Sequence, residues 1–151
     1  MKIRSAASSK DLSRSELVVG FVHEKGKPTL AGVLADAVTH AERTGDMARG
    51  ARKWSLFHPP LRARGPQRLA FVGLGKAEEL DRENLRRAVA VAQHSAENAG
   101  VEDFALVLGD ADHRGLDAFD AGVVVAEGLE LGAYRYQPPK KDDQKPRKAQ
   151  D

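Results

Sequence analysis

The sequence has no cysteine, and aromatic residues make up only 5% of its 151 residues. The absence of cysteine excludes a disulfide-stapled scaffold, a thiolate zinc site and a cysteine nucleophile. No apolar run approaches the roughly 18 residues that a membrane-spanning helix needs, and residues 1–5 lack the apolar core of a secretory signal. We therefore expect a cytoplasmic protein that does not associate with membranes.

An excess of one charge is also missing from most of the chain. The formal net charge is +2, and residues 138–151 alone hold five basic and three acidic side chains, which leaves the rest neutral. The net charge is thus no argument for nucleic-acid binding by itself. Residues 138–151 also contain three prolines and no large apolar residue. We expect an interdomain linker or disordered tail there, after one globular domain over residues 1–137.

Apolar periodicity predicts alternating strands and helices in this domain. Continuous apolar runs, typical of strands covered on both faces, occur at residues 17–22, 68–74 and 104–109. Helical spacing occurs at residues 30–43, 81–99 and 117–132. Thr29 and Asp81 are the expected N-caps of the first two helices, and Gly45 and Gly100 their expected ends. The alternation predicts an α/β fold with parallel strand pairing through right-handed crossovers.

The turn Gly-Leu-Gly-Lys at residues 73–76 lies between a strand and a helix, where phosphate-binding loops occur. A P-loop needs an earlier glycine, where Ala70 stands, and a hydroxyl after the lysine, where Ala77 stands. A dinucleotide fingerprint needs a small residue at position 78, which is Glu78. We interpret the segment as a tight strand-to-helix turn.

Other catalytic and metal-binding patterns are incomplete. His23 and Glu24 begin like a zinc-protease helix, but Lys27 occupies the position of the second histidine. Asp110, Asp112 and His113 follow a predicted strand, where a site can form, although turn-capping acids are more common there. No Gly-x-Ser-x-Gly nucleophile elbow is present.

A basic stretch between Met47 and Arg68 contains no acidic residue. Positive side chains beside aromatic rings are typical of nucleic-acid binding, because the cations contact phosphates and the rings stack on bases. The candidate contacts are Arg49, Arg52, Lys53, Trp54, Arg62, Arg64 and Arg68. The alternative is a solvated loop whose aromatic residues anchor it to the core.

Several blocks together resemble the N-terminal domain of the leucyl (cytosol) aminopeptidase family. They are the apolar run at 17–21, RLAFVGLGK at 68–76, LRRA at 85–88 and AEGLELGAYRY at 126–136. The last block is similar to the family's helix that leads into a Gly-x-Tyr-x-Phe/Tyr segment. The resemblance implies a macro-domain-like, three-layer α/β/α fold with a mostly parallel central sheet.

The same resemblance implies that catalysis lies elsewhere in a longer polypeptide. In that family two divalent metals (zinc, manganese or magnesium) bind to the C-terminal domain and activate water, which releases N-terminal residues such as leucine from peptides. The family motif Asn-Thr-Asp-Ala-Glu-Gly-Arg does not occur in this sequence. We therefore carry over no catalytic residue and no metal ligand, and expect a non-catalytic accessory domain without a cofactor.

The resemblance also bears on partners. The expected partner is the catalytic domain of the same polypeptide, which is absent from these 151 residues. The parent enzyme is expected to be a homohexamer, and the isolated domain a monomer or weak oligomer. Two alternatives stay open: a nucleic-acid-binding module that uses residues 49–68, and a macro-like binder of a nucleotide or ADP-ribose. The acidic loop at Gly109–Asp112 is unfavourable for a diphosphate.

Overall fold

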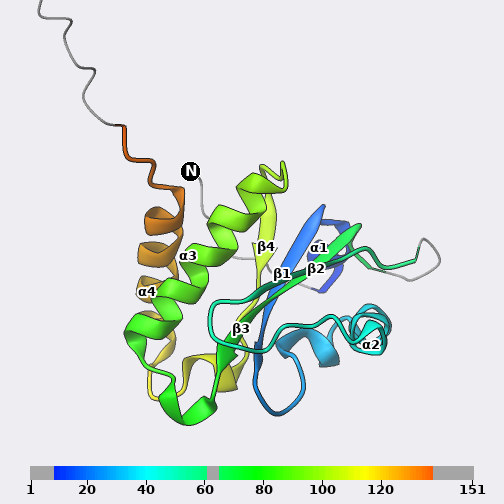
Figure 1. The fold of residues 1–151 in the computed structure, drawn as a ribbon, viewed down its shortest axis with the longest axis horizontal. Coiled ribbons are helices and arrows are strands. Elements are labelled where there is room, and N and C mark those ends of the chain that lie inside the picture. The colour runs from blue at the N-terminus through cyan, green and yellow to red at the C-terminus, as the bar shows by residue number, and fades with distance from the viewer. Residues whose placement is uncertain (1–8, 61–64, 138–151) are drawn as a thin grey trace, which may run out of the picture.

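The computed structural model describes residues 9–60 and 65–137, which form three layers (Figure 1). The helices are α1 (Ser9–Arg14), α2 (Ala35–Thr44), α3 (Arg82–Asn98) and α4 (Ala118–Ala133), and the strands are β1 (Leu17–His23), β2 (Trp54–Phe57), β3 (Arg68–Gly75) and β4 (Phe104–Leu106). Short 3₁₀ turns follow three of the strands: η1 (Thr29–Gly32), η2 (Ala77–Glu79) and η3 (Asp110–His113). The predicted three-layer α/β/α architecture is confirmed.

The four strands form one mixed sheet in the order β2-β3-β1-β4. β1 pairs in parallel with both β3 and β4, as the sequence predicts. β2 pairs antiparallel with β3, and Trp54 lies opposite Val72. β2 was not predicted from the sequence. It has only four residues and lies inside the basic stretch, and its alternating burial does not give the continuous apolar run that marks the other strands.

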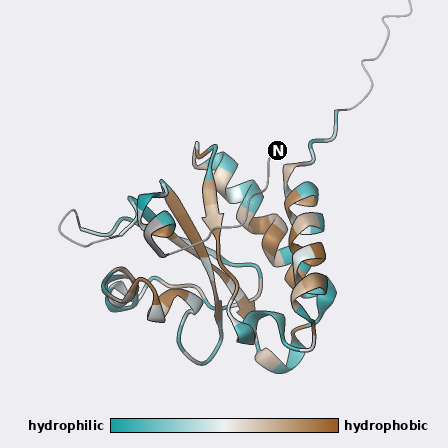
Figure 2. Ribbon diagram, turned by 180° about the vertical axis from the view of Figure 1, so that it is seen from behind, coloured by the Kyte–Doolittle hydropathy of each residue, from teal (hydrophilic) through white to brown (hydrophobic). Residues whose placement is uncertain are grey.

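The core has two halves, one on each face of the sheet. β1 is buried along its whole length, so its alternate side chains enter both halves. Leu17, Val19 and Phe21 pack with α3 and α4, whereas Val18 and Val22 pack with η1 and α2. Figure 2 shows the strands and much of α4 in the colours of hydrophobic residues. The alanine-rich face of α3 covers the half that contains Leu17, Val19 and Phe21.

Side chains cap the N-terminal ends of α3, as predicted, and of α4, for which no cap was predicted. The Asp81 carboxylate accepts a hydrogen bond from Asn84 N at 2.7 Å, and Asp117 accepts one from Asp120 N at 2.8 Å. Gly100 follows α3 with φ +74°, a left-handed conformation that glycine adopts at little cost. The N-terminal capping of these two helices is therefore local, and the sequence contains all that it needs.

The predicted helix over residues 30–43 is wrong as a single element. The chain forms η1, breaks at Leu34 (φ −124°, ψ 49°), and then forms α2, which ends at Gly45 (φ 72°) as predicted. Thr29 is not a side-chain cap, because its hydroxyl lies 3.0 Å from the Phe21 carbonyl oxygen and also contacts the Asp112 carboxylate. A tertiary contact thus replaces the local one.

The third predicted strand is shorter than its apolar run. β4 ends at Leu106, although Val107 N still donates to Val19 O at 2.9 Å. The predicted tail, residues 138–151, lies outside the described residues. Among the described helices, none is long and apolar enough to cross a membrane.

Candidate functional site

The carboxyl ends of the parallel strands form the first candidate site. β1, β3 and β4 end at one edge of the sheet, away from the point where the chain leaves α4 (Figure 1). Open α/β sheets bind ligands outside these ends, where successive connections leave toward opposite faces. Here the connection after β1 leads to α2 on one face, and the connection after β3 leads to α3 on the other. In an open α/β sheet, a ligand is therefore expected to bind between the carboxyl ends of β1 and β3.

A buried polar network occupies the β1 and β4 side of this edge. Asp112 is 2% exposed and accepts hydrogen bonds from Gly109 N at 2.8 Å and from the Thr29 hydroxyl. His23 Nε2 lies 3.0 Å from the Ala111 carbonyl oxygen and 3.5 Å from an Asp112 carboxylate oxygen. If Nε2 carries the proton and donates it to this carbonyl, His23 Nδ1 is left buried without a partner in the described part of the chain. The network ties the loop after β4 to the end of β1.

The acidic loop is a capped turn, as the simpler interpretation predicts. Asp112 points inward and accepts from the main chain three residues earlier. Asp110 is exposed, and its carboxylate lies 3.9 Å from His113 Nε2. His23 and Thr29 were not predicted to join Asp112, because 83 residues separate Thr29 from Asp112 and no local pattern links them.

The β3 side of the edge is closed by residues 49–53, which we call the strap. The strap extends the antiparallel pairing of β2 along β3. Three main-chain hydrogen bonds hold it: Gly73 N to Lys53 O at 2.8 Å, Arg52 N to Gly73 O at 2.8 Å, and Gly75 N to Arg49 O at 3.1 Å. Phosphate sites need free main-chain N–H groups that point toward the anion. The N–H groups of Gly73 and Gly75 are already used by the strap.

The Arg49 side chain completes this closure. Its Nη1 donates to the carbonyl oxygens of His23 at 3.1 Å and Gly26 at 2.7 Å, and its Nη2 lies 3.6 Å from Glu42. A Cβ added at Gly73 would lie 2.1 Å from the Gly50 carbonyl oxygen, so only glycine allows the strap to lie so close. At Gly73 and Gly75 the geometry therefore gives no support to the nucleotide or ADP-ribose alternative, because the strap already uses the N–H groups that a phosphate would need.

The structure divides the predicted nucleic-acid contacts between two places. Arg49 lies at the carboxyl end of β3, and Arg68 begins β3 at the other end, roughly 20 Å away at about 3.3 Å per residue. Arg68 donates to the Ala99 carbonyl oxygen at 3.0 Å and forms an ion pair with Glu16. Both arginines thus have structural partners.

The remaining basic residues of the stretch are placed differently. Arg52 (φ +62°) and Lys53 are exposed on the strap, next to the half-buried Trp54, which packs against the core. Arg62 and Arg64 lie outside the described residues. The structure therefore brings Arg52 and Lys53 together and separates them from Arg68.

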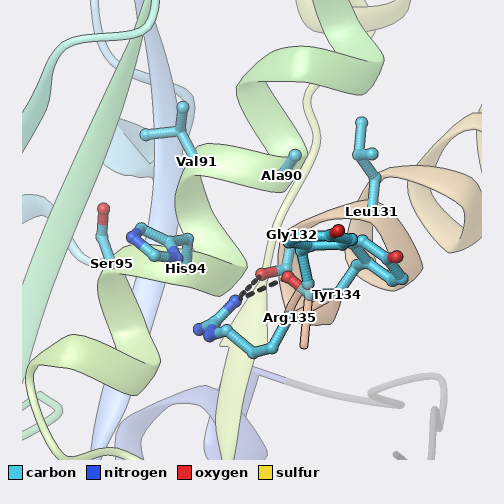
Figure 3. A pocket seen from close by; sticks show the side chains of 9 residues that line it. Ala90, Val91, His94, Ser95, Leu131, Gly132, Tyr134 and Arg135 are labelled. Atoms are coloured by element: carbon cyan, nitrogen blue, oxygen red, sulfur yellow. Dashed lines mark hydrogen bonds between the residues drawn. The ribbon is translucent and has the colours of Figure 1, made fainter. Parts of the chain in front are cut away.

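A second candidate site is a shallow groove of about 430 Å³ between α3 and the end of α4 with the segment that follows it (Figure 3). Its lining combines Val91, His94 and Ser95 of α3 with Leu131, Tyr134 and Tyr136. Arg135 does not offer a free charge there, because it donates to Gly132 O at 2.9 Å and to Tyr134 O at 3.1 Å and pairs with Glu97. The groove is an apolar surface rather than a polar reaction site.

Neither candidate site offers a metal centre. Within residues 9–60 and 65–137, no three or more His, Asp or Glu side chains are grouped so that they could hold a metal ion. The resemblance implies a two-metal centre in the C-terminal domain of the family, and no residue of this chain was predicted to hold a metal.

Comparison with known proteins identifies the family. The model for "Cytosol aminopeptidase family, N-terminal domain" matches residues 18–143. The chain belongs to the cytosol aminopeptidase family. Its match covers the sheet from Val18 onward, the strap and the described helices from α2 onward, and the resemblance noted from the sequence is confirmed.

Relatives within the family are much longer than this chain. The chain is 28% identical over 153 residues to a probable cytosol aminopeptidase of Halorhodospira halophila, which covers 98% of the chain and 30% of the relative. It is also 28% identical over 119 residues to a probable cytosol aminopeptidase of Alkaliphilus metalliredigens, over 78% of the chain and 22% of the relative. The chain thus spans less than a third of these relatives.

Two solved structures share the fold. The bottromycin maturation enzyme BotP has a TM-score of 0.58 at 21% identity, over 84% of this chain and 25% of BotP. The macrodomain of Mycobacterium tuberculosis DarG has a TM-score of 0.55 at 16% identity, over 80% of this chain and 86% of that chain. The expected macro-domain-like fold is confirmed by this likeness.

Proposed function

We propose that this chain is the non-catalytic, accessory N-terminal domain of a cytoplasmic metal-dependent aminopeptidase. The observation that carries the proposal is the match of the family's N-terminal domain over residues 18–143. The closed carboxyl edge supports it, because the strap and Arg49 use the groups that a ligand would need. Peptide hydrolysis with two divalent metals, and assembly into a homohexamer, are then properties of the longer polypeptide.

The division of labour has a direct test. We expect the purified 151-residue chain to hydrolyse leucine p-nitroanilide with added manganese no faster than buffer. A chimera in which this chain replaces the matched part of the Halorhodospira halophila relative is expected to be active, because the chemistry resides in the retained part. Turnover by the short chain that rises in proportion to its concentration would refute the proposal.

We propose nucleic-acid binding as a second function, carried by the basic stretch. The observation that favours it is the exposure of Arg52 and Lys53 side by side on the strap, in a stretch without acidic residues. Since Arg49 and Arg68 are engaged within the fold, Arg62 and Arg64 supply the other phosphate contacts. Four contacts at most predict a log–log salt slope for duplex DNA no steeper than about −3.6, at roughly 0.9 per contact.

Charge reversal tests this second function. The double variant Arg62→Glu with Arg64→Glu is expected to weaken DNA binding at low salt, while the matched variant Lys140→Glu with Lys141→Glu leaves it unchanged. The native state must first be shown by circular dichroism to be intact in both. Absence of duplex-DNA binding by the unmodified chain, or loss only with the 140–141 variant, would refute the function.

A further inference from the structure

Four exposed cations gather around the carboxyl end of β3. Lys25 and Lys27 lie on the loop that follows β1, and Arg52 and Lys53 lie on the strap. The other arginines of the basic stretch that the structure describes are held by acidic partners. These four side chains, which we call the edge cations, form no ion pair within the described part of the chain. Their charges are therefore available to a partner.

Main-chain contacts bring the two pairs of edge cations together. Glu24 N donates to Gly75 O at 2.7 Å, and Gly75 N donates to Arg49 O at 3.1 Å, so the loop after β1 and the strap flank the end of β3. The Arg49 side chain bridges them, because its Nη1 donates at 2.7 Å to the carbonyl oxygen of Gly26, which lies between the two lysines. Neighbouring strands lie about 4.8 Å apart, so the two pairs stand on main chains roughly 10 Å apart.

Acidic side chains near this end of β3 offset one further lysine but not the edge cations. Lys76 is exposed there, but Glu78 and Glu79 follow it directly in η2, and Glu24 lies across the hydrogen bond to Gly75. Like-sized opposite charges at such short range cancel much of each other's field, so Lys76 is not counted. Even if Glu24 is counted against the edge cations instead, four positive charges face one negative charge.

The aromatic rings of the basic stretch are not available beside the edge cations. Phe57 is 6% exposed, and Trp54 packs with the core on the α3 side of the sheet. His58 is exposed, but it follows β2 at the end opposite to the strap. Proteins that bind single strands stack bases on such rings, whereas a duplex presents one phosphate charge per about 1.7 Å of its axis. Cations without rings are therefore suited to the backbone of a duplex.

We propose that the edge cations bind the phosphate backbone of duplex DNA without reading its bases. The proposal rests on the second proposed function, because it requires that the chain binds nucleic acid. It adds Lys25 and Lys27, which lie outside the basic stretch, and it assigns a duplex rather than a single strand as the ligand. Since the strap already uses the N–H groups of Gly73 and Gly75, the contacts come from side chains alone.

The experiment measures how salt weakens the binding of the 151-residue chain to a labelled duplex DNA, followed by fluorescence anisotropy. The basic stretch alone predicts a log–log salt slope no steeper than about −3.6, at roughly 0.9 per phosphate contact. With Lys25 and Lys27 added, six contacts predict a slope of about −5.4. Between 50 and 200 mM salt the affinity is then expected to fall about 1,800-fold rather than about 150-fold.

Two double variants identify the surface. Lys25→Gln with Lys27→Gln is expected to reduce the slope to about −3.6, and Arg52→Gln with Lys53→Gln is expected to reduce it equally. All four side chains are exposed, so circular dichroism and urea denaturation are expected to show an intact fold in both variants.

A third double variant is the matched control for the loss of two positive charges. Arg14→Gln with Lys140→Gln removes the same charge, but Arg14 lies in α1, before the amino end of β1, and Lys140 belongs to residues 138–151. The control is expected to keep the slope of the unmodified chain.

A single strand of the same sequence tests the class of ligand. It is expected to bind more weakly than the duplex, with a slope of about −4.2 at roughly 0.7 per contact. The fluorescence of Trp54, the only tryptophan, is expected to be the same with and without either DNA.

Each other outcome overturns the proposal. If duplex binding persists and the slope of the Lys25 and Lys27 variant equals that of the unmodified chain, the edge surface is wrong and the second proposed function stands. An equal change of slope in the control shows that only the total charge matters. Tighter binding of the single strand with quenching of Trp54 shows stacking instead of backbone contacts. Absence of duplex binding by the unmodified chain refutes the second proposed function, and this surface with it.

Discussion

The close packing of α4 on α3 depends on Gly128 and Gly132 of α4. A Cβ added at Gly128 would lie 2.7 Å from both the Arg86 carbonyl oxygen and the Val89 Cβ, where ordinary contact begins at 3.4 Å. The helices must therefore separate by about 0.7 Å, and overpacking of this kind costs about 1–3 kcal/mol. Alanine in place of glycine within a helix gains back about 0.5–1 kcal/mol. We expect Gly128→Ala to lower the free energy of unfolding by about 1–2 kcal/mol.

The same helix contains its own control. Gly122 is exposed, and a Cβ there would meet nothing within 4 Å. Gly122→Ala is therefore expected to raise the free energy of unfolding by about 0.5–1 kcal/mol through helix propensity alone. Urea denaturation followed by circular dichroism at 222 nm measures both variants. If Gly128→Ala stabilises the domain as much as Gly122→Ala does, the close packing of α3 on α4 is wrong.

Further substitutions test the carboxyl edge. Asp112→Ala leaves Gly109 N–H without its acceptor and is expected to lower the free energy of unfolding by about 1–3 kcal/mol, measured by urea denaturation. Asp112→Asn keeps an oxygen that can accept this hydrogen bond, so it is expected to cost less. Equal losses for the two variants would contradict the hydrogen-bond account. Arg49→Met keeps the aliphatic stem but removes the bonds to His23 and Gly26, so we expect a loss of about 1–2 kcal/mol and faster amide exchange at residues 24–26. Unchanged exchange there would show that Arg49 does not hold the loop.

Much of the fold could be predicted because the deciding interactions are local. The buried strands show as continuous apolar runs, and α3 carries its N-cap at Asp81 and its terminal glycine at Gly100 within one sequence window. Where a distant group competes, the sequence is insufficient. Thr29 has the right residue type for a cap, but its hydroxyl contacts Asp112, 83 residues away, and the predicted helix begins later.

The strap shows why the candidate site was harder to predict than the fold. Six positive side chains lie near Trp54 in the sequence, whereas in the structure Arg49 and Arg68 lie beside opposite ends of β3. The glycine at position 73 was the available indication, because a glycine inside a buried strand often marks a close main-chain approach. It does so here, against Gly50.

The carboxyl edge of the sheet and its lateral edge at β4 differ in how their polar and apolar groups are covered. At the carboxyl edge, the strap accepts from the N–H groups of Gly73 and Gly75, and Asp112 accepts from that of Gly109, so a ligand would have to displace these bonds to use the three donors. At the lateral edge, β4 pairs with β1 alone in the described part of the chain, and Phe119 and Leu131 of α4 are exposed. Uncovered apolar surface beside unpaired main-chain groups favours protein over small molecules, because a strand satisfies both at once. Both edges agree with the proposed role of this domain as an accessory part of a longer aminopeptidase.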